Sequence, residues 1–180
     1  MRAFIALDIP DAVKERILAL QKKLPSVGVR PVASANMHIT LKFLGDIHED
    51  LMKCTMKKLV EISFRSFSLE LTHLGAFPSS EQIRVIWVGG ESTAFDALAS
   101  QIEQSLAGLF PREKPVLHLT IARVGPEAQQ KELHDFLSAH KTVALGSIPV
   151  HVFSLKQSIL TSKCPVYTDL ATYQSNDEKT

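Results

Sequence analysis

The N-terminal third of the chain twice passes from a strand pattern to a helix pattern. Residues 4–9 are a nearly continuous apolar run that predicts a strand, and Pro10-Asp11 is a typical helix start. The helix would bury one face at helical spacing, made of Val13, Ile17, Leu20 and Leu24. Residues 36–45 then alternate apolar and polar positions, and a second amphipathic helix begins near residue 49.

The remaining pattern predicts a hairpin, two more helices and three further strands. Residues 67–77 and 83–88 read as strands around the turn 78–81, followed by a helix over 93–109 and a strand over 116–124. A helix over 127–139 precedes strands at 148–160 and 166–173, which the turn 162–165 separates. Helices mixed with hairpin-like neighbours favour an α+β fold over a doubly wound parallel sheet.

The length of 180 residues fits one folding unit. We expect a single domain over residues 1–174, with 175–180 as a frayed polar tail. No glycine-rich phosphate loop follows any predicted strand, so the common nucleotide cofactors find no cradle. We expect a protein without a cofactor.

The composition of the chain limits the kinds of partner that the protein can bind. The chain is 45% hydrophobic with a net charge of +1, which argues against a broad basic surface that coats nucleic acid but leaves room for a site holding one RNA end. No stretch approaches a membrane span, and residues 2–8 do not fit a signal peptide, so we expect a cytoplasmic protein. Cys54 and Cys164 lack metal-ligand spacing and are expected to be reduced, packed thiols.

The candidate chemistry lies in two short repeats. Residues 37–42, "MHITLK", and 117–122, "LHLTIA", each place a histidine and a threonine two positions apart on a predicted strand. The flanking apolar residues would bury one face of the strand and leave His38 and Thr40, or His118 and Thr120, on the other. A third match at residues 140–142 sits at a polar helix end, where His140 fits a cation near a helix C-terminus.

This pattern suits chemistry at phosphorus. A threonine hydroxyl can hold a phosphoryl oxygen, while an imidazole two positions away reaches an attacking or leaving oxygen. Two imidazoles with ordinary pKa values of about 6.5 can act as general base and general acid near neutral pH, and no metal is required.

Five segments follow one another along the chain: "MRAFIALDIP", "NMHITLKFLGDI", "GAFPSSEQIRVIWVG", "HLTIARV" and "SILTSKCPVYTDLATY". In this order they resemble the 2H phosphoesterases. Within that family they resemble the RNA 2′,3′-cyclic phosphodiesterases, which are also called 2′-5′ RNA ligases. The resemblance implies a bilobal fold, with two pseudo-twofold-related antiparallel sheets and flanking helices around a central cleft. It implies an enzyme that hydrolyses the 2′,3′-cyclic phosphate end of RNA, such as a tRNA fragment, to a 2′-phosphate, with ATP-independent 2′-5′ joining as a minor activity. Separately from the resemblance, we expect a monomer. By family pattern His38 would be the proton donor and His118 the proton acceptor.

Four residues are expected to contact the substrate phosphate. Thr40 and Thr120 follow from the motifs, and strict alternation puts Lys42 on the face of the first motif, although a solvated surface lysine fits equally well. Arg123 matches the arginine after the second motif in the family, but alternation places it opposite His118, so contact needs a bulge, a twist or an early strand end.

The sequence allows two roles for three aromatic residues. Phe43, Phe77 and Trp87 could stack on a base, but core packing is the favoured role for each. Two other functions fit the same histidines: a non-catalytic module that binds RNA ends or nucleotides, and a phosphodiesterase acting on a small cyclic nucleotide or an ADP-ribose cyclic phosphate.

Overall fold

The computed structural model describes residues 1–162 and 164–178. The helices are α1 (Asp11–Gln21), α2 (Glu49–Val60), α3 (Thr93–Ser105) and α4 (Gln130–Ala139), with the short 3-10 helices η1 (Ser34–Asn36) and η2 (Asn176–Glu178). The strands are β1 (Arg2–Asp8), β2 (Val29–Pro31), β3 (His38–Asp46), β4 (Phe67–Glu70), β5 (His73–Pro78), β6 (Ile83–Gly89), β7 (His118–Val124), β8 (Ser147–Val150), β9 (Val152–Leu160) and β10 (Pro165–Gln174).

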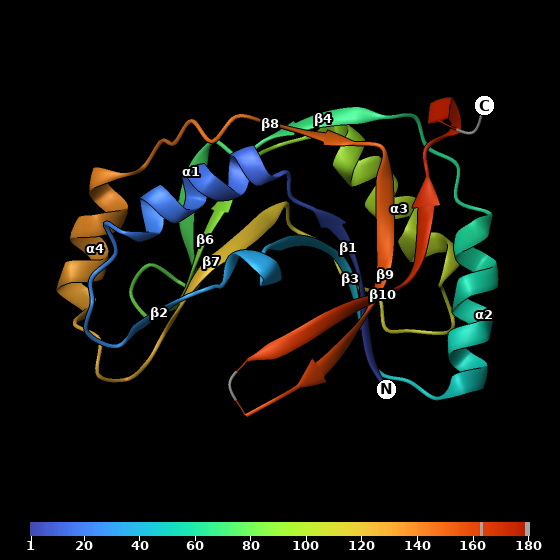
Figure 1. Ribbon diagram of the computed structural model, residues 1–180, viewed down its shortest axis with the longest axis horizontal. Helices are drawn as coiled ribbons and strands as arrows, with labels where there is room; N and C mark the ends of the chain where they lie inside the picture. Colours follow the sequence, from blue (N-terminus) through green and yellow to red (C-terminus); the bar gives the residue numbers. More distant parts are fainter. Residues whose placement is uncertain (163, 179–180) are drawn as a thin grey trace.

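Two antiparallel four-stranded sheets form the two lobes (Figure 1). The first has the order β10-β9-β1-β3 and the second the order β2-β7-β6-β5, while β4 and β8 make a separate pair. Helices α2 and α3 lie against the first sheet, and α1 and α4 lie on the side of the second. The expected α+β class and the two-sheet arrangement with flanking helices are confirmed.

The two sheets are arranged alike: strands β9, β1 and β3 of the first sheet correspond to β5, β6 and β7 of the second. In the first sheet Asp8 on β1 pairs with His38, the first residue of β3. In the second sheet Gly89 on β6 pairs with His118, the first residue of β7. The two histidine motifs therefore occupy equivalent places at the start of equivalent strands.

The core forms where one stripe of each helix meets a sheet. The predicted stripe of α1 is buried at Val13, Ile17 and Leu20, whereas Leu24 lies beyond the end of the helix and is only partly buried. Burial of these apolar side chains is the main favourable contribution to the free energy of folding. It holds the strands in place, and with them the two histidine motifs.

Two predicted strands are divided in the structure. The run over 67–77 is interrupted at residues 71–72, so that β4 pairs with β8 and only β5 pairs with β6. The run over 148–160 is likewise broken at His151 between β8 and β9. A continuous apolar pattern does not show where a strand changes partner, because side chains alternate in the same way on both sides of the break.

The short strand β2 was not predicted, since three residues carry little periodicity. It pairs with β7, and the buried Gln21 secures its end by donating from Nε2 to the carbonyl oxygens of Val32 at 2.9 Å and Ile121 at 2.7 Å. This strand forms one edge of the second sheet, next to β7 (Figure 1).

The expected frayed tail is wrong over residues 175–177. Ser175 is buried and its backbone N donates to the His151 carbonyl at 2.7 Å, while the backbone N of Asn176 donates to the Phe64 carbonyl at 2.9 Å. These bonds fasten the end of the chain to the first lobe, and residues 179–180 lie outside the described part.

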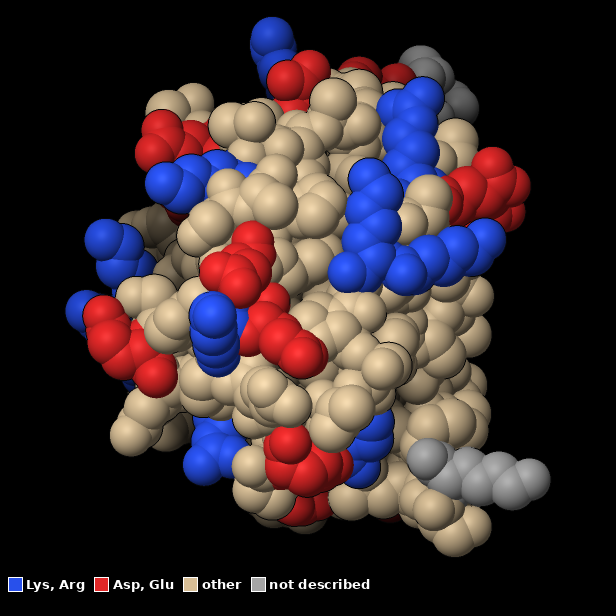
Figure 2. Space-filling view, turned by 90° about the vertical axis from the view of Figure 1, so that its left-hand side faces the viewer, with Lys and Arg blue, Asp and Glu red and all other residues tan. Residues whose placement is uncertain are grey.

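No helix in the described ranges is long and apolar enough to cross a membrane. On the face shown in Figure 2, several lysine and arginine side chains lie together at the upper right, and elsewhere basic and acidic side chains are mixed.

Candidate active site

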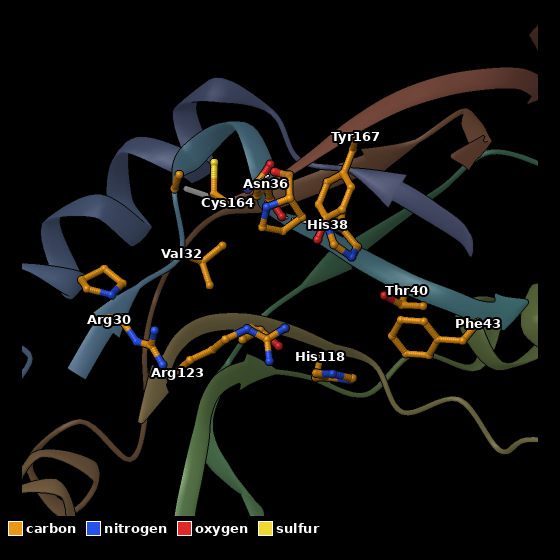
Figure 3. Close-up of a pocket in the computed structure, with 14 residues that line it drawn as sticks. Arg30, Val32, Asn36, His38, Thr40, Phe43, His118, Arg123, Cys164 and Tyr167 are labelled. Atoms are coloured by element: carbon orange, nitrogen blue, oxygen red, sulfur yellow. Dashed lines mark hydrogen bonds between the residues drawn. The ribbon is translucent and has the colours of Figure 1, made fainter. Parts of the chain in front are cut away.

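A cavity of about 360 Å³ lies between the two sheets and contains both histidine motifs (Figure 3). Strand β3 forms one wall and β7 the other, and the β2–η1 segment and the start of β10 close one end. The lining residues are Arg30, Pro31, Val32, Ala33, Asn36, His38, Thr40, Phe43, His118, Thr120, Arg123, Cys164, Pro165 and Tyr167.

The two histidines are held in the same way. His38 Nδ1 lies 2.8 Å from the Asn36 carbonyl oxygen, and His118 Nδ1 lies 2.8 Å from the Val116 carbonyl oxygen. Because a carbonyl oxygen only accepts, each Nδ1 must carry a proton and donate it. Each imidazole is thereby fixed as the tautomer whose Nε2 is free for proton transfer.

Aromatic rings pack against both imidazoles. His38 contacts Tyr167 edge-on, with ring centroids 5.2 Å apart, and Phe4 at 4.8 Å. On the other wall His118 contacts Phe77 at 5.1 Å and Trp87 at 6.1 Å. Contacts of this kind restrict ring rotation and complete the fixing of both histidines.

Tight packing behind His118 depends on one glycine. A Cβ at Gly75 would overlap the Trp87 ring, so the strand β5 can approach the indole only without a side chain at this position. Phe77 and Trp87 are half-buried and pack against each other, with ring centroids 5.2 Å apart, and against His118. Neither belongs to the buried core, so the favoured core-packing role is wrong for both.

A bulge in β3 overturns the expectation for Lys42. In the pairing of β1 with β3, Ala6 lies opposite Thr40 but Ile5 lies opposite Lys42, so Leu41 is an extra residue. Thr40 and Lys42 consequently point to opposite faces. Lys42 is buried on the face away from the cavity, where its Nζ lies 2.5 Å from Glu103 Oε1 and 2.9 Å from the Pro111 carbonyl oxygen.

The same bulge brings Phe43 into the cavity. Its side chain lines the wall and is 57% exposed, so the core-packing role expected for it is wrong. Figure 3 shows the ring beside Thr40, at the end of the cavity away from Arg30.

A matching bulge in β7 resolves the position of Arg123. Trp87 lies opposite Thr120 and Ile86 opposite Ala122, so Ile121 is the extra residue. Arg123 is thereby shifted to the face of the second motif and lines the cavity. Since both bulges follow the motif threonine, Arg123 occupies the place in its lobe that Phe43 occupies in the other.

The motif threonines also line the cavity. Thr40 is 9% exposed and Thr120 is half-buried. Within residues 1–162 and 164–178 neither hydroxyl has a hydrogen-bond partner, so both can donate to a bound oxyanion.

The electrostatic surroundings distinguish the two histidines. Burial lowers the pKa of His38, and the Lys156 cation makes a smaller contribution in the same direction. The hydrogen bond to the Asn36 carbonyl and the negative charge of Asp8 act in the opposite direction and raise the pKa. Lys156 Nζ lies 2.8 Å from Asp8 Oδ1 and 2.5 Å from Asp169 Oδ1. In the second lobe Gly89 stands where Asp8 stands in the first, so this arrangement has no counterpart beside His118.

Burial alone would lower the pKa of Lys156, but its bonds to Asp169 and Asp8 outweigh that effect and raise it. The ammonium therefore stays charged beside His38 over the whole range in which an imidazole titrates.

Several cavity residues were not expected from the sequence. Tyr167, Asn36 and Arg30 come from segments without a motif, and only their tertiary positions show that they face the histidines. Asn36 Nδ2 donates to the Pro165 carbonyl at 3.0 Å, which ties the start of β10 to the first motif. Cys164 is free but exposed at the cavity, so the expected packing of this thiol is wrong.

No group of three or more His, Cys, Asp or Glu side chains within the described residues is arranged to hold a metal ion.

Comparisons with known proteins identify the family of the chain. Residues 7–87 match the family described as LigT-like phosphoesterase. The RNA 2′,3′-cyclic phosphodiesterase of Archaeoglobus fulgidus is 36% identical over 97% of this chain and 100% of its own length, and that of Methanocaldococcus jannaschii is 35% identical over 93% and 96%. The crystal structure of Escherichia coli LigT complexed with 3′-AMP aligns with a TM-score of 0.80 and 26% identity, covering 97% of this chain and 98% of LigT. The chain therefore belongs to the LigT-like phosphoesterases, the 2H group that its sequence resembles.

Proposed function

We propose that this protein hydrolyses the 2′,3′-cyclic phosphate at the 3′ end of RNA, for example of a tRNA fragment, to a 2′-phosphate. The observation that carries the proposal is the matched pair His38 and His118, each fixed through Nδ1 and each accompanied by a cavity-facing threonine. The names of the relatives support the substrate class.

The reaction is a displacement at phosphorus. Neutral His118 Nε2 takes a proton from water as the water oxygen bonds to phosphorus, and the bond from phosphorus to the 3′ oxygen breaks. Protonated His38 donates from Nε2 to that leaving oxygen, so the phosphate stays on the 2′ oxygen. If the 5′-hydroxyl of a second RNA replaces water, the same displacement gives 2′-5′ joining without ATP as a minor activity.

The other cavity residues contact the phosphates of the RNA. The hydroxyls of Thr40 and Thr120 donate to the two non-bridging phosphoryl oxygens, one from each wall. Arg123 supplies positive charge to the RNA phosphates from the same face as His118.

The surroundings of His38 support its role as donor. A lowered pKa makes the imidazolium a stronger acid towards the departing 3′ oxygen. The negative charge of the bound phosphate favours the protonated form when substrate is present.

We further propose that the protein acts as a cytoplasmic monomer. The cavity is formed by elements of one chain alone, so no second copy is needed to complete it.

The test is to incubate the purified protein, with EDTA, with a short RNA ending in a 2′,3′-cyclic phosphate and to identify the terminal product. We expect a 2′-phosphate. A 3′-phosphate would reverse the proposed orientation of the substrate, and tight binding without any product would favour a binding module. Competition by a 2′,3′-cyclic mononucleotide or an ADP-ribose cyclic phosphate at lower concentration than the RNA would favour a small-molecule substrate.

A further inference from the structure

Two arginines face each other at one end of the cavity. Strand β2 pairs with β7 so that Arg30 lies directly opposite Arg123. Directly opposed residues of antiparallel strands point to the same face, and both side chains line the cavity (Figure 3).

This pairing brings two positive charges together. Like charges directly opposite on neighbouring strands repel and destabilise a sheet. Within residues 1–162 and 164–178, no carboxylate forms an ion pair with either arginine. The described part of the chain thus supplies no carboxylate to these two guanidinium groups, and a bound anion would relieve the repulsion.

The reacting phosphate does not account for both arginines. A cyclic phosphodiester has two non-bridging oxygens, and Thr40 and Thr120 offer one hydroxyl for each. His118 opens β7 while Arg123 stands one residue before its end, an offset on the order of 13 Å between Cα atoms after allowance for the bulge. The arginine pair therefore lies towards the end of the cavity away from Phe43.

We propose that Arg30 and Arg123 form a second anion site, for the phosphodiester immediately 5′ to the terminal nucleotide of the RNA. The inference rests on the proposed function and deepens it. Guanidinium groups suit this ligand because they donate two parallel hydrogen bonds to phosphate oxygens. A cyclic mononucleotide without a 5′-phosphate lacks the second anion, so the enzyme prefers an oligonucleotide end.

The experiment compares two dinucleotides that both end in a 2′,3′-cyclic phosphate. One has the natural phosphodiester linkage and the other a methylphosphonate linkage, which is nearly the same shape but uncharged. For the wild-type protein we expect kcat/KM to be at least about tenfold lower on the uncharged substrate, because charge-assisted hydrogen bonds are lost.

Substitution of Arg30 tests the assignment to this residue. Arg30→Gln should lower kcat/KM on the natural substrate and reduce the difference between the two substrates, and Arg30→Lys should restore part of that difference. The matched control is Arg84→Gln, since Arg84 is an exposed arginine of the same sheet that does not line the cavity. It should leave the ratio between the substrates unchanged.

The outcomes separate this inference from the proposed function. If the wild-type protein converts both dinucleotides equally well to the 2′-phosphate, the second anion site is wrong and the proposed function stands. If neither is hydrolysed, the proposed function fails. If Arg30→Gln lowers kcat/KM equally on both substrates and its thermal stability is unchanged, Arg30 does not interact with the charge of the phosphodiester.

Discussion

Replacement of Lys42 by methionine separates a structural role from a substrate-binding role. The Lys42 side chain is 1% exposed and its partner Glu103 is 14% exposed, so the ion pair is almost fully buried. Removing one partner leaves the other charge buried without compensation, and the Pro111 carbonyl oxygen also loses its donor.

The magnitude follows from that burial. Breaking a buried ion pair costs about 3–5 kcal/mol, and the residual exposure of Glu103 places this pair near the lower end, at about 3 kcal/mol. For a chain of 180 residues this corresponds to a fall in melting temperature of about 6–12 °C. Because Lys42 faces away from the cavity, kcat/KM on a cyclic-phosphate RNA should stay within about threefold of wild type below the transition, far from the loss caused by removing an acid or base.

The assay combines urea or thermal unfolding with steady-state kinetics. The double variant Lys42→Met, Glu103→Met should recover most of the stability, since replacing both partners by apolar groups removes the uncompensated charge. If Lys42→Met has normal stability but a kcat/KM reduced tenfold or more, the reasoning is refuted. Lys42 would then contact the substrate phosphate, as the sequence alternation predicted.

Four further predictions concern the two histidines and the residues around them. His38→Ala and His118→Ala should each lower kcat by about 10²- to 10⁴-fold with near-wild-type melting temperatures, and turnover close to wild type in either variant would contradict the two-histidine mechanism. Thr40→Val and Thr120→Val remove one hydroxyl each at almost constant volume and should lower kcat/KM roughly tenfold, measured on the same RNA with circular dichroism as the folding control. The pH profile of kcat/KM should be bell-shaped, with its alkaline limb set by His38, which must be protonated to donate. Lys156→Met removes a cation that lowers the pKa of His38, so this limb should move to higher pH, and an unmoved limb together with an unmoved His38 titration by NMR would count against the electrostatic account.

Local patterns in the sequence determined the elements and the chemistry. The stripe of α1, the hairpin of β5 and β6 and the two strands that begin with His38 and His118 follow from periodicity, because the alternation of buried and exposed side chains is a property of each segment. The motif residues and the family resemblance indicated the pair of histidines before any contact between them was known.

Tertiary pairing decided which neighbours share the cavity. The bulges at Leu41 and Ile121 reverse the alternation, so that Lys42 turns into the protein while Phe43 and Arg123 turn towards the histidines. A bulge depends on how two strands fit together, and a single strand's sequence does not show it.

Long-range contacts decided the rest of the site. Tyr167 against His38 and Arg30 opposite Arg123 join segments that are more than 90 residues apart in the chain. Such pairs depend on the packing of the sheets and on a strand of three residues, β2, that is too short to carry a pattern of its own. The sequence by itself therefore determined the reacting groups, and only the tertiary structure decided which charges and rings surround them.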